Sequence, residues 1–137
     1  MTSSKSADAQ PRLHVVVYSD NPATRQQVMA ALGPRPNPGL PQLEYVEVGS
    51  YPALIQRIDA GGIDLAVLDG EAAPAGGLGI AKQLKDEVVK CPPIVVLTGR
   101  ADDAWLARWS RAESAVSHPI DPFKLTAAVV SLLKVPA

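Results

Sequence analysis

The chain has 137 residues, enough for one domain with a hydrophobic core and too few for two ordinary domains. The chain has thirteen basic and fourteen acidic side chains, so its net charge is −1. We therefore expect no broad electrostatic attraction to nucleic acid or to an anionic membrane. No apolar stretch approaches the roughly 20 residues of a membrane-spanning helix. The single cysteine, Cys91, excludes an internal disulfide and favours a reducing compartment. We therefore expect a cytoplasmic protein without direct membrane insertion, in which Cys91 is a small buried apolar residue.

The first 11 residues differ in composition from the rest of the chain. They are small and polar, and their apolar surface is too small to offset the entropy lost when they become ordered. This composition predicts a flexible tail, followed by a single domain over residues 12–135. Within that domain, short apolar runs predict five strands. The predicted strands are Leu13–Tyr18, Leu43–Val48, Leu65–Leu68, Ile94–Leu97 and Ala115–Ser117. The second run alternates polar and apolar residues, which is typical of an edge strand, and the others are nearly continuous, as in strands buried on both faces.

Helical signals separate these runs. The clearest helices begin at Pro22 after the N-cap Asn21, and at Pro122 after Asp121. Less regular helices are expected at about 51–60, 77–89 and 101–111. The alternation predicts an α/β fold of three layers: a doubly wound, five-stranded parallel sheet of order 2-1-3-4-5, as in flavodoxin-like proteins. Residues 33–41 hold four of the thirteen prolines, and we expect a stiff loop that is a surface insertion rather than a binding loop.

Polar residues follow the strands at the edge where such sheets bind ligands. They are Ser19, Asp20 and Asn21; Asp69, Gly70 and Glu71; Thr98 and Gly99; and His118 and Pro119. Asp20 and Asp69 could hold Mg²⁺, and a carboxylate beside Mg²⁺ can attack phosphorus while Thr98 hydrogen-bonds a phosphoryl oxygen. The alternative is that both aspartates are turn residues at strand ends.

Four segments of residues 12–135 together resemble the receiver domain of bacterial response regulators. These segments are Ser19–Arg25, Asp64–Asp69, Ile94–Gly99 and His118–Pro122. The resemblance implies that Asp69 is the phosphoacceptor of a histidine kinase and that Thr98 contacts the phosphoryl group. It also implies that Asp20 and Asp69 hold Mg²⁺ with the backbone carbonyl of Glu71, and that a cis peptide bond precedes Pro119.

The chain departs from the family pattern at three positions. Ser19 replaces the first acid of the family's acidic pair, so Mg²⁺ binding is expected to be weak. His118 replaces the lysine beside the phosphoryl group and is either a partly protonated substitute for it or a neutral, hydrogen-bonded residue. Ala115 replaces the aromatic ring whose rotation relays the switch. In addition, Arg111 stands near a position where the family often has glycine.

Two functions therefore remain open. The favoured one is an atypical, stand-alone pseudo-receiver, in which phospho-switching is weakened or absent. It would act as a docking module or accessory subunit of a larger protein assembly, and its partner would hold it at the periphery of that assembly. The alternative is a working two-component receiver, phosphorylated on Asp69 by a histidine kinase and acting on a target in another chain. A metal-assisted phosphohydrolase with Glu71 as its acid–base group is disfavoured, so we expect no enzyme.

Two tryptophans are candidate anchors for a protein partner. Trp105 and Trp109 are spaced i, i+4 on the predicted fourth helix, and tryptophan is enriched in interface hot spots. The alternative is that at least one of them fills the core.

Overall fold

The computed structural model describes residues 11–70, 77–88, 91–99 and 111–133. Five parallel strands form one sheet in the order β2-β1-β3-β4-β5, which confirms the predicted fold class. The strands are β1 (Leu13–Tyr18), β2 (Leu43–Val48), β3 (Leu65–Asp69), β4 (Ile94–Thr98) and β5 (Ser114–Ser117). The helices are α2 (Pro22–Leu32), α3 (Tyr51–Asp59), α4 (Gly77–Glu87) and α6 (Pro122–Leu133).

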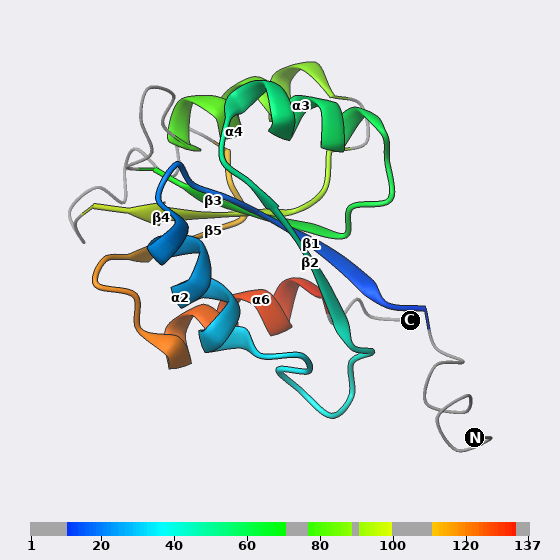
Figure 1. The fold of residues 1–137 in the computed structure, drawn as a ribbon, viewed down its shortest axis with the longest axis vertical. Helices are drawn as coiled ribbons and strands as arrows, with labels where there is room; N and C mark the ends of the chain where they lie inside the picture. The colour runs from blue at the N-terminus through cyan, green and yellow to red at the C-terminus, as the bar shows by residue number, and fades with distance from the viewer. Residues whose placement is uncertain (1–10, 71–76, 89–90, 100–110, 134–137) are drawn as a thin grey trace.

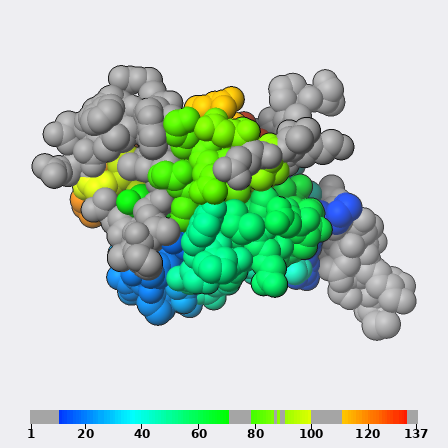
Figure 2. All heavy atoms as spheres, turned by 90° about the horizontal axis from the view of Figure 1, so that it is seen from above, coloured from blue at the N-terminus to red at the C-terminus, as the bar shows by residue number. Residues whose placement is uncertain are grey.

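Helices cover both faces of the sheet and divide the core into two halves (Figure 1). Alternate strand residues face opposite sides, so Val15 and Val17 pack towards α2 and α6 while Val16 and Tyr18 pack towards α3 and α4. Figure 2 looks onto α3 and α4, which together cover their face of the sheet. Strands β3 and β4 are buried along their whole length, as strands of a doubly covered parallel sheet must be.

The clearest sequence signals match the element boundaries. The Asn21 side chain accepts a hydrogen bond from the amide of Ala23 at 2.9 Å and starts α2, and Gly33 ends it with a φ of 67°. Strands β3 and β4 each run one residue further than predicted, because Asp69 and Thr98 still pair with neighbouring strands through their backbones. Cys91 is only partly buried, and burial raises the pKa of its thiol.

Several predictions fall on other parts of the chain. Three predictions lie outside the described residues. They are residues 1–10 of the tail predicted over residues 1–11, the helix predicted at 101–111 apart from Arg111, and the roles of Trp105 and Trp109. Arg111 itself has a φ of 66°, a backbone conformation that favours glycine, and its guanidinium pairs with Asp86. Among the helices that the structure describes, none combines the length and apolar character needed to cross a membrane.

The proline-rich loop of residues 33–41 lies largely at the surface, as predicted, but one of its residues, Leu40, contributes to the core. Leu40 is 5% exposed and packs within the α2 and α6 half of the core. The amide of Leu43 donates to the carbonyl oxygen of Pro34 at 2.8 Å, and the Tyr45 hydroxyl donates to the carbonyl oxygen of Gly33. These bonds attach the N-terminal end of the loop to β2.

Replacing Leu40 should therefore destabilise the domain. We expect Leu40→Ala to lower the free energy of unfolding by about 2–4 kcal/mol, because it removes buried methyl groups and leaves a cavity. Arg35 is an exposed residue of the same loop, and Arg35→Ala should change the value by less than about 0.5 kcal/mol. Urea unfolding of both variants tests this, and equal effects would contradict the packing of Leu40.

Tyr45 should make stability depend on alkaline pH. Burial raises the pKa of Tyr45 to about 12, whereas an unfolded tyrosine ionises near its ordinary value of 10.0. As pH rises between these values, the unfolded state loses its proton first, so folding stability falls. We expect unfolding free energies measured at pH 8 and pH 11 to decline more in the wild type than in Tyr45→Phe. Equal declines of the unfolding free energy in the two proteins would show that burial does not hinder ionisation of the Tyr45 phenol.

Candidate functional site

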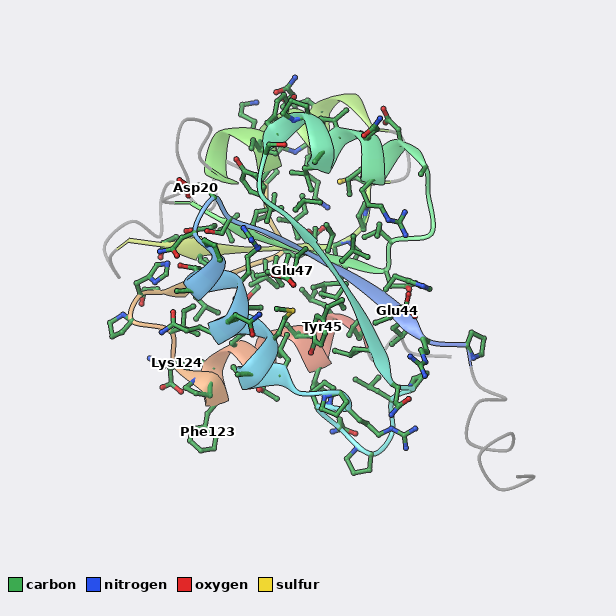
Figure 3. The ribbon with its side chains drawn as sticks, viewed as in Figure 1. Asp20, Glu44, Tyr45, Glu47, Phe123 and Lys124 are labelled. Carbon is green, nitrogen blue, oxygen red and sulfur yellow. The ribbon has the colours of Figure 1, made fainter. Side chains whose placement is uncertain are left out.

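The predicted polar residues converge at the carboxyl edge of the sheet. A cavity of about 370 Å³ is lined by Asp20, Asn21, Thr24, Asp69, Gly99 and His118. These residues come from the loop after β1, the start of α2 and the ends of β3, β4 and β5. Figure 3 shows Asp20 at the turn between β1 and α2. The topology thus brings together residues from four separate segments, as expected for a doubly wound sheet.

Ser19 is hydrogen-bonded directly to Asp69. Its hydroxyl donates to Oδ2 of Asp69 at 2.7 Å and accepts from the amide of Asn21 at 3.1 Å. Ser19 is fully buried and Asp69 is 4% exposed. The hydroxyl therefore donates its proton to the carboxylate of Asp69, at the place where the family pattern has the first acid of its acidic pair. Oδ2 of Asp69 thus has a hydrogen-bond donor within the protein.

His118 faces the other oxygen of Asp69. Its Nε2 lies 3.6 Å from Oδ1, beyond the range of a hydrogen bond. Nε2 is buried and has no hydrogen-bond partner among the described residues, although the side chain as a whole is 28% exposed. The amide of His118 donates to the carbonyl oxygen of Thr98 at 2.8 Å, and the peptide bond to Pro119 is cis. The backbone of His118 is thus held against the end of β4.

The site carries a concentration of negative charge near a buried phenol. Burial raises the pKa of Tyr18, and the carboxylates of Asp20 and Asp69 raise it further. Sequence reasoning assigned Tyr18 only to the strand, because nothing in a buried apolar run marks its last residue as part of a site. Thr24 lines the cavity and was likewise missed as a site residue.

Arg25 supports the loop that carries Ser19 and Asp20. Its Nη1 donates to the carbonyl oxygen of Ser19 at 2.6 Å, and its Nε lies 3.0 Å from Oε1 of Glu47 on the edge strand β2. A Cβ added at Gly49 would lie 3.3 Å from the same guanidinium, so this glycine leaves room for it. Arg25 belongs to the segment Ser19–Arg25 that carries the family resemblance. Its ion pair with Glu47, in contrast, becomes apparent only once β1 and β2 are paired in register.

Thr98 does not line this cavity. It is buried at the end of β4 and borders a second hollow of about 390 Å³, beside β5 and α6. Ala115 lines the same hollow and is exposed, so no ring from this position of β5 fills the space beside Thr98. Glu71, Trp105 and Trp109 fall outside the described residues, and their predicted roles remain predictions.

Mg²⁺ has fewer charged donors here than in the family pattern, because Ser19 stands in place of one acid. The fold family implies this ion beside Asp69, and Asp20 supplies a second carboxylate to the cavity. In the part of the chain that the structure describes, however, no three His, Cys, Asp or Glu side chains are grouped to hold a metal ion. One oxygen of Asp69 is engaged by Ser19, which offers a neutral oxygen in place of a charged one.

Comparison with known proteins gives close relatives in sequence. No protein-family model matches the chain. Two proteins of Mycobacterium tuberculosis, the uncharacterized response regulatory proteins Rv3143 and MT3230, are each 62% identical over 130 residues. The match covers 95% of this chain and 98% of each relative.

Solved structures with the same fold are more distant in sequence. A receiver domain from Bacteroides fragilis matches with a TM-score of 0.72 at 18% identity, covering 91% of this chain and 99% of that chain. A putative response regulator from Chloroflexus aurantiacus matches with a TM-score of 0.76, also at 18% identity, covering 90% and 99%. These similarities establish the fold, while the sequence relatives establish the family.

The hydrogen bond between Ser19 and Asp69 should contribute measurably to stability. We expect Ser19→Ala to lower the free energy of unfolding by about 1–3 kcal/mol, because it leaves a buried carboxylate oxygen without its donor. Ser131 is the matched control, since its exposed hydroxyl only donates to the carbonyl oxygen of Ala128. Ser131→Ala should change the value by less than about 0.5 kcal/mol. Equal losses in chemical denaturation would contradict this role of Ser19.

Proposed function

Because the chain belongs to the response regulator family, we propose that it is a pseudo-receiver that acts by binding proteins. In this proposal it is a docking module or accessory subunit of a larger assembly, with weakened or absent phospho-switching and no enzymatic turnover. The observation that carries the proposal is the buried hydrogen bond from Ser19 to Oδ2 of Asp69.

That bond opposes phosphorylation in two ways. A carboxylate that attacks phosphorus must use an oxygen lone pair, and the charge-assisted bond from Ser19 already engages one of the two oxygens of Asp69. The serine also removes one negative charge from the cation site, so an ion that offsets charge during transfer is held more weakly. A hydroxyl in place of the acid thus stabilises the unmodified aspartate and disfavours its reaction.

The described side chains also lack the usual relay of the signal. Thr98 and Ala115 line one hollow, and alanine has no ring that could move into or out of it. A ligand shifts a protein between two states only by its different affinity for them. A phosphoryl group on Asp69 would therefore cause little change in the conformation of the surface beside β5.

Protein docking has support from the exposed surface. Phe123, at the start of α6, is 86% exposed and projects from the domain (Figure 3). An exposed aromatic side chain is a suitable anchor for a partner, since such residues contribute strongly to protein interfaces. This surface does not depend on the chemistry of Asp69.

The alternative function is a working phosphoacceptor. It has support from Oδ1 of Asp69, which lies on the side of His118 and is not the oxygen that Ser19 engages. In that case a histidine kinase would phosphorylate Asp69 with weakly held Mg²⁺, and the target would be another chain.

Beryllofluoride binding distinguishes the two functions. With millimolar Mg²⁺ we expect no tryptophan fluorescence change and no mass shift with a small phosphodonor in the wild type. The double variant Ser19→Asp with His118→Lys restores the family's acid and cation, and it should bind beryllofluoride at least about tenfold more tightly than the wild type. A stable adduct of the wild type that is lost in Asp69→Ala would overturn the pseudo-receiver and support the phosphoacceptor.

A further inference from the structure

We infer that the proline-rich loop of residues 33–41 is a docking surface for a protein partner whose contact surface combines tryptophan or tyrosine rings with a carboxylate. The inference rests on the proposed function and deepens it, since it assigns a surface and a partner chemistry to the docking module. The loop joins α2 to β2 and extends outward in Figure 1, at the opposite edge of the sheet from the cavity that holds Asp69. Binding at the loop therefore leaves that cavity open.

The protein holds the loop in one conformation. The Asn37 side chain accepts from the amide of Gly39 at 2.8 Å, and the Asn37 carbonyl oxygen accepts from the amide of Leu40 at 3.0 Å, which closes a turn. Buried Leu40 anchors this turn in the core, and the Pro34 carbonyl oxygen accepts from the amide of Leu43 at 2.8 Å. Proline rings fix φ at four of the nine positions. A loop that is ordered before binding loses little conformational entropy when a partner binds.

The exposed backbone of the loop offers hydrogen-bond acceptors and few donors. Its four prolines have no amide hydrogen, and the amides of Gly33, Gly39 and Leu40 already donate within the protein. In the described part of the chain, the carbonyl oxygens of Pro36 and Pro38 have no hydrogen-bond donor. A partner that binds this surface must therefore bring donors of its own.

Tryptophan and tyrosine meet this requirement. Their rings carry an indole N–H or a phenol O–H, and the ring faces pack on proline rings, as in the aromatic-lined grooves that bind proline-rich peptides. Pro34 and Pro38 are both exposed and available for such packing. The turn at Asn37 interrupts any extended run of the loop, so the partner needs a short cleft that accepts a turn instead of a long peptide groove.

Arg35 supplies the charge of the docking surface. It is exposed between two prolines, and no hydrogen bond or ion pair joins its side chain to another described residue. The other described arginines each contact a carboxylate or a backbone carbonyl; they are Arg12, Arg25, Arg57 and Arg111. An unpaired guanidinium can bind a carboxylate through two N–H groups and can stack on an aromatic ring. The partner surface is therefore expected to be acidic as well as aromatic.

Nuclear magnetic resonance of the ¹⁵N-labelled full chain with two matched probes tests the inference. Indole-3-acetate has an aromatic ring, an N–H donor and a carboxylate, whereas cyclohexylacetate has the carboxylate alone. We expect indole-3-acetate to shift the amides of Arg35, Asn37 and Gly39 and to bind at least about threefold more tightly than cyclohexylacetate. Shifts confined to other surfaces, or equal binding of the two probes, would overturn the inference.

Arg12 provides a matched control for Arg35. It is also exposed, but its guanidinium lies 3.9 Å from the carboxylate of Glu44. Arg35→Ala should weaken the binding of indole-3-acetate about two- to fivefold, while Arg12→Ala leaves it unchanged. Equal effects of the two substitutions would contradict the role of Arg35.

A displayed peptide library tests the chemistry of the partner. Selection on the wild-type chain, with counter-selection on Arg35→Ala, should enrich peptides in which Trp or Tyr stands close to Asp or Glu. Enrichment of peptides without aromatic or without acidic residues would overturn the assignment. A second copy of this chain would be the occupant if sedimentation showed dimers that Arg35→Ala abolishes, and that result would also overturn it.

The outcome is separable from that of the proposed function. A beryllofluoride adduct at Asp69 together with intact binding at the loop would overturn the pseudo-receiver and keep the docking surface. Absence of both the adduct and binding at the loop would do the reverse.

Discussion

The hydrogen bond between Ser19 and Asp69 links the ends of two central strands. Strands β1 and β3 are neighbours, and their register pairs Tyr18 with Leu68, so the next residue of each strand meets at the same edge. Both side chains are buried, which makes the bond strong and its loss costly. The orientation of the Asp69 carboxylate in the cavity depends on this contact.

The departures from the receiver pattern act on one another through charge. Replacing the first acid by serine removes a negative charge, and replacing lysine by histidine removes a permanent positive one. The result is a site in which an imidazole and a hydroxyl stand where the family pattern has a lysine and an acid. At Ala115 the side chain is a methyl group, so no ring from this position of β5 lies beside Thr98.

Periodicity in the sequence was sufficient for most of the fold. The bounds of β1 and α2 match their predictions, since a continuous apolar run and a capped helix are local signals. Leu40 was not recognised as a core residue because a single leucine among prolines has no periodicity. Its burial depends on how the loop crosses the base of α2 and β2, which is a tertiary property. Strand β3 includes Asp69 because ladder bonds are made by the backbone and do not require an apolar side chain.

The sequence by itself determined the sheet order, the edge at which the polar residues gather and the family to which they belong. These follow from patterns within short segments and from the handedness of strand crossovers. Only the tertiary structure decided that Ser19 donates to Asp69, that His118 lies close to it without a hydrogen bond, and that Thr98 and Ala115 share a separate hollow. The reason is that hydrogen bonds and ligand spacing depend on distances of a few tenths of an ångström between segments far apart in the chain, and no local pattern encodes them.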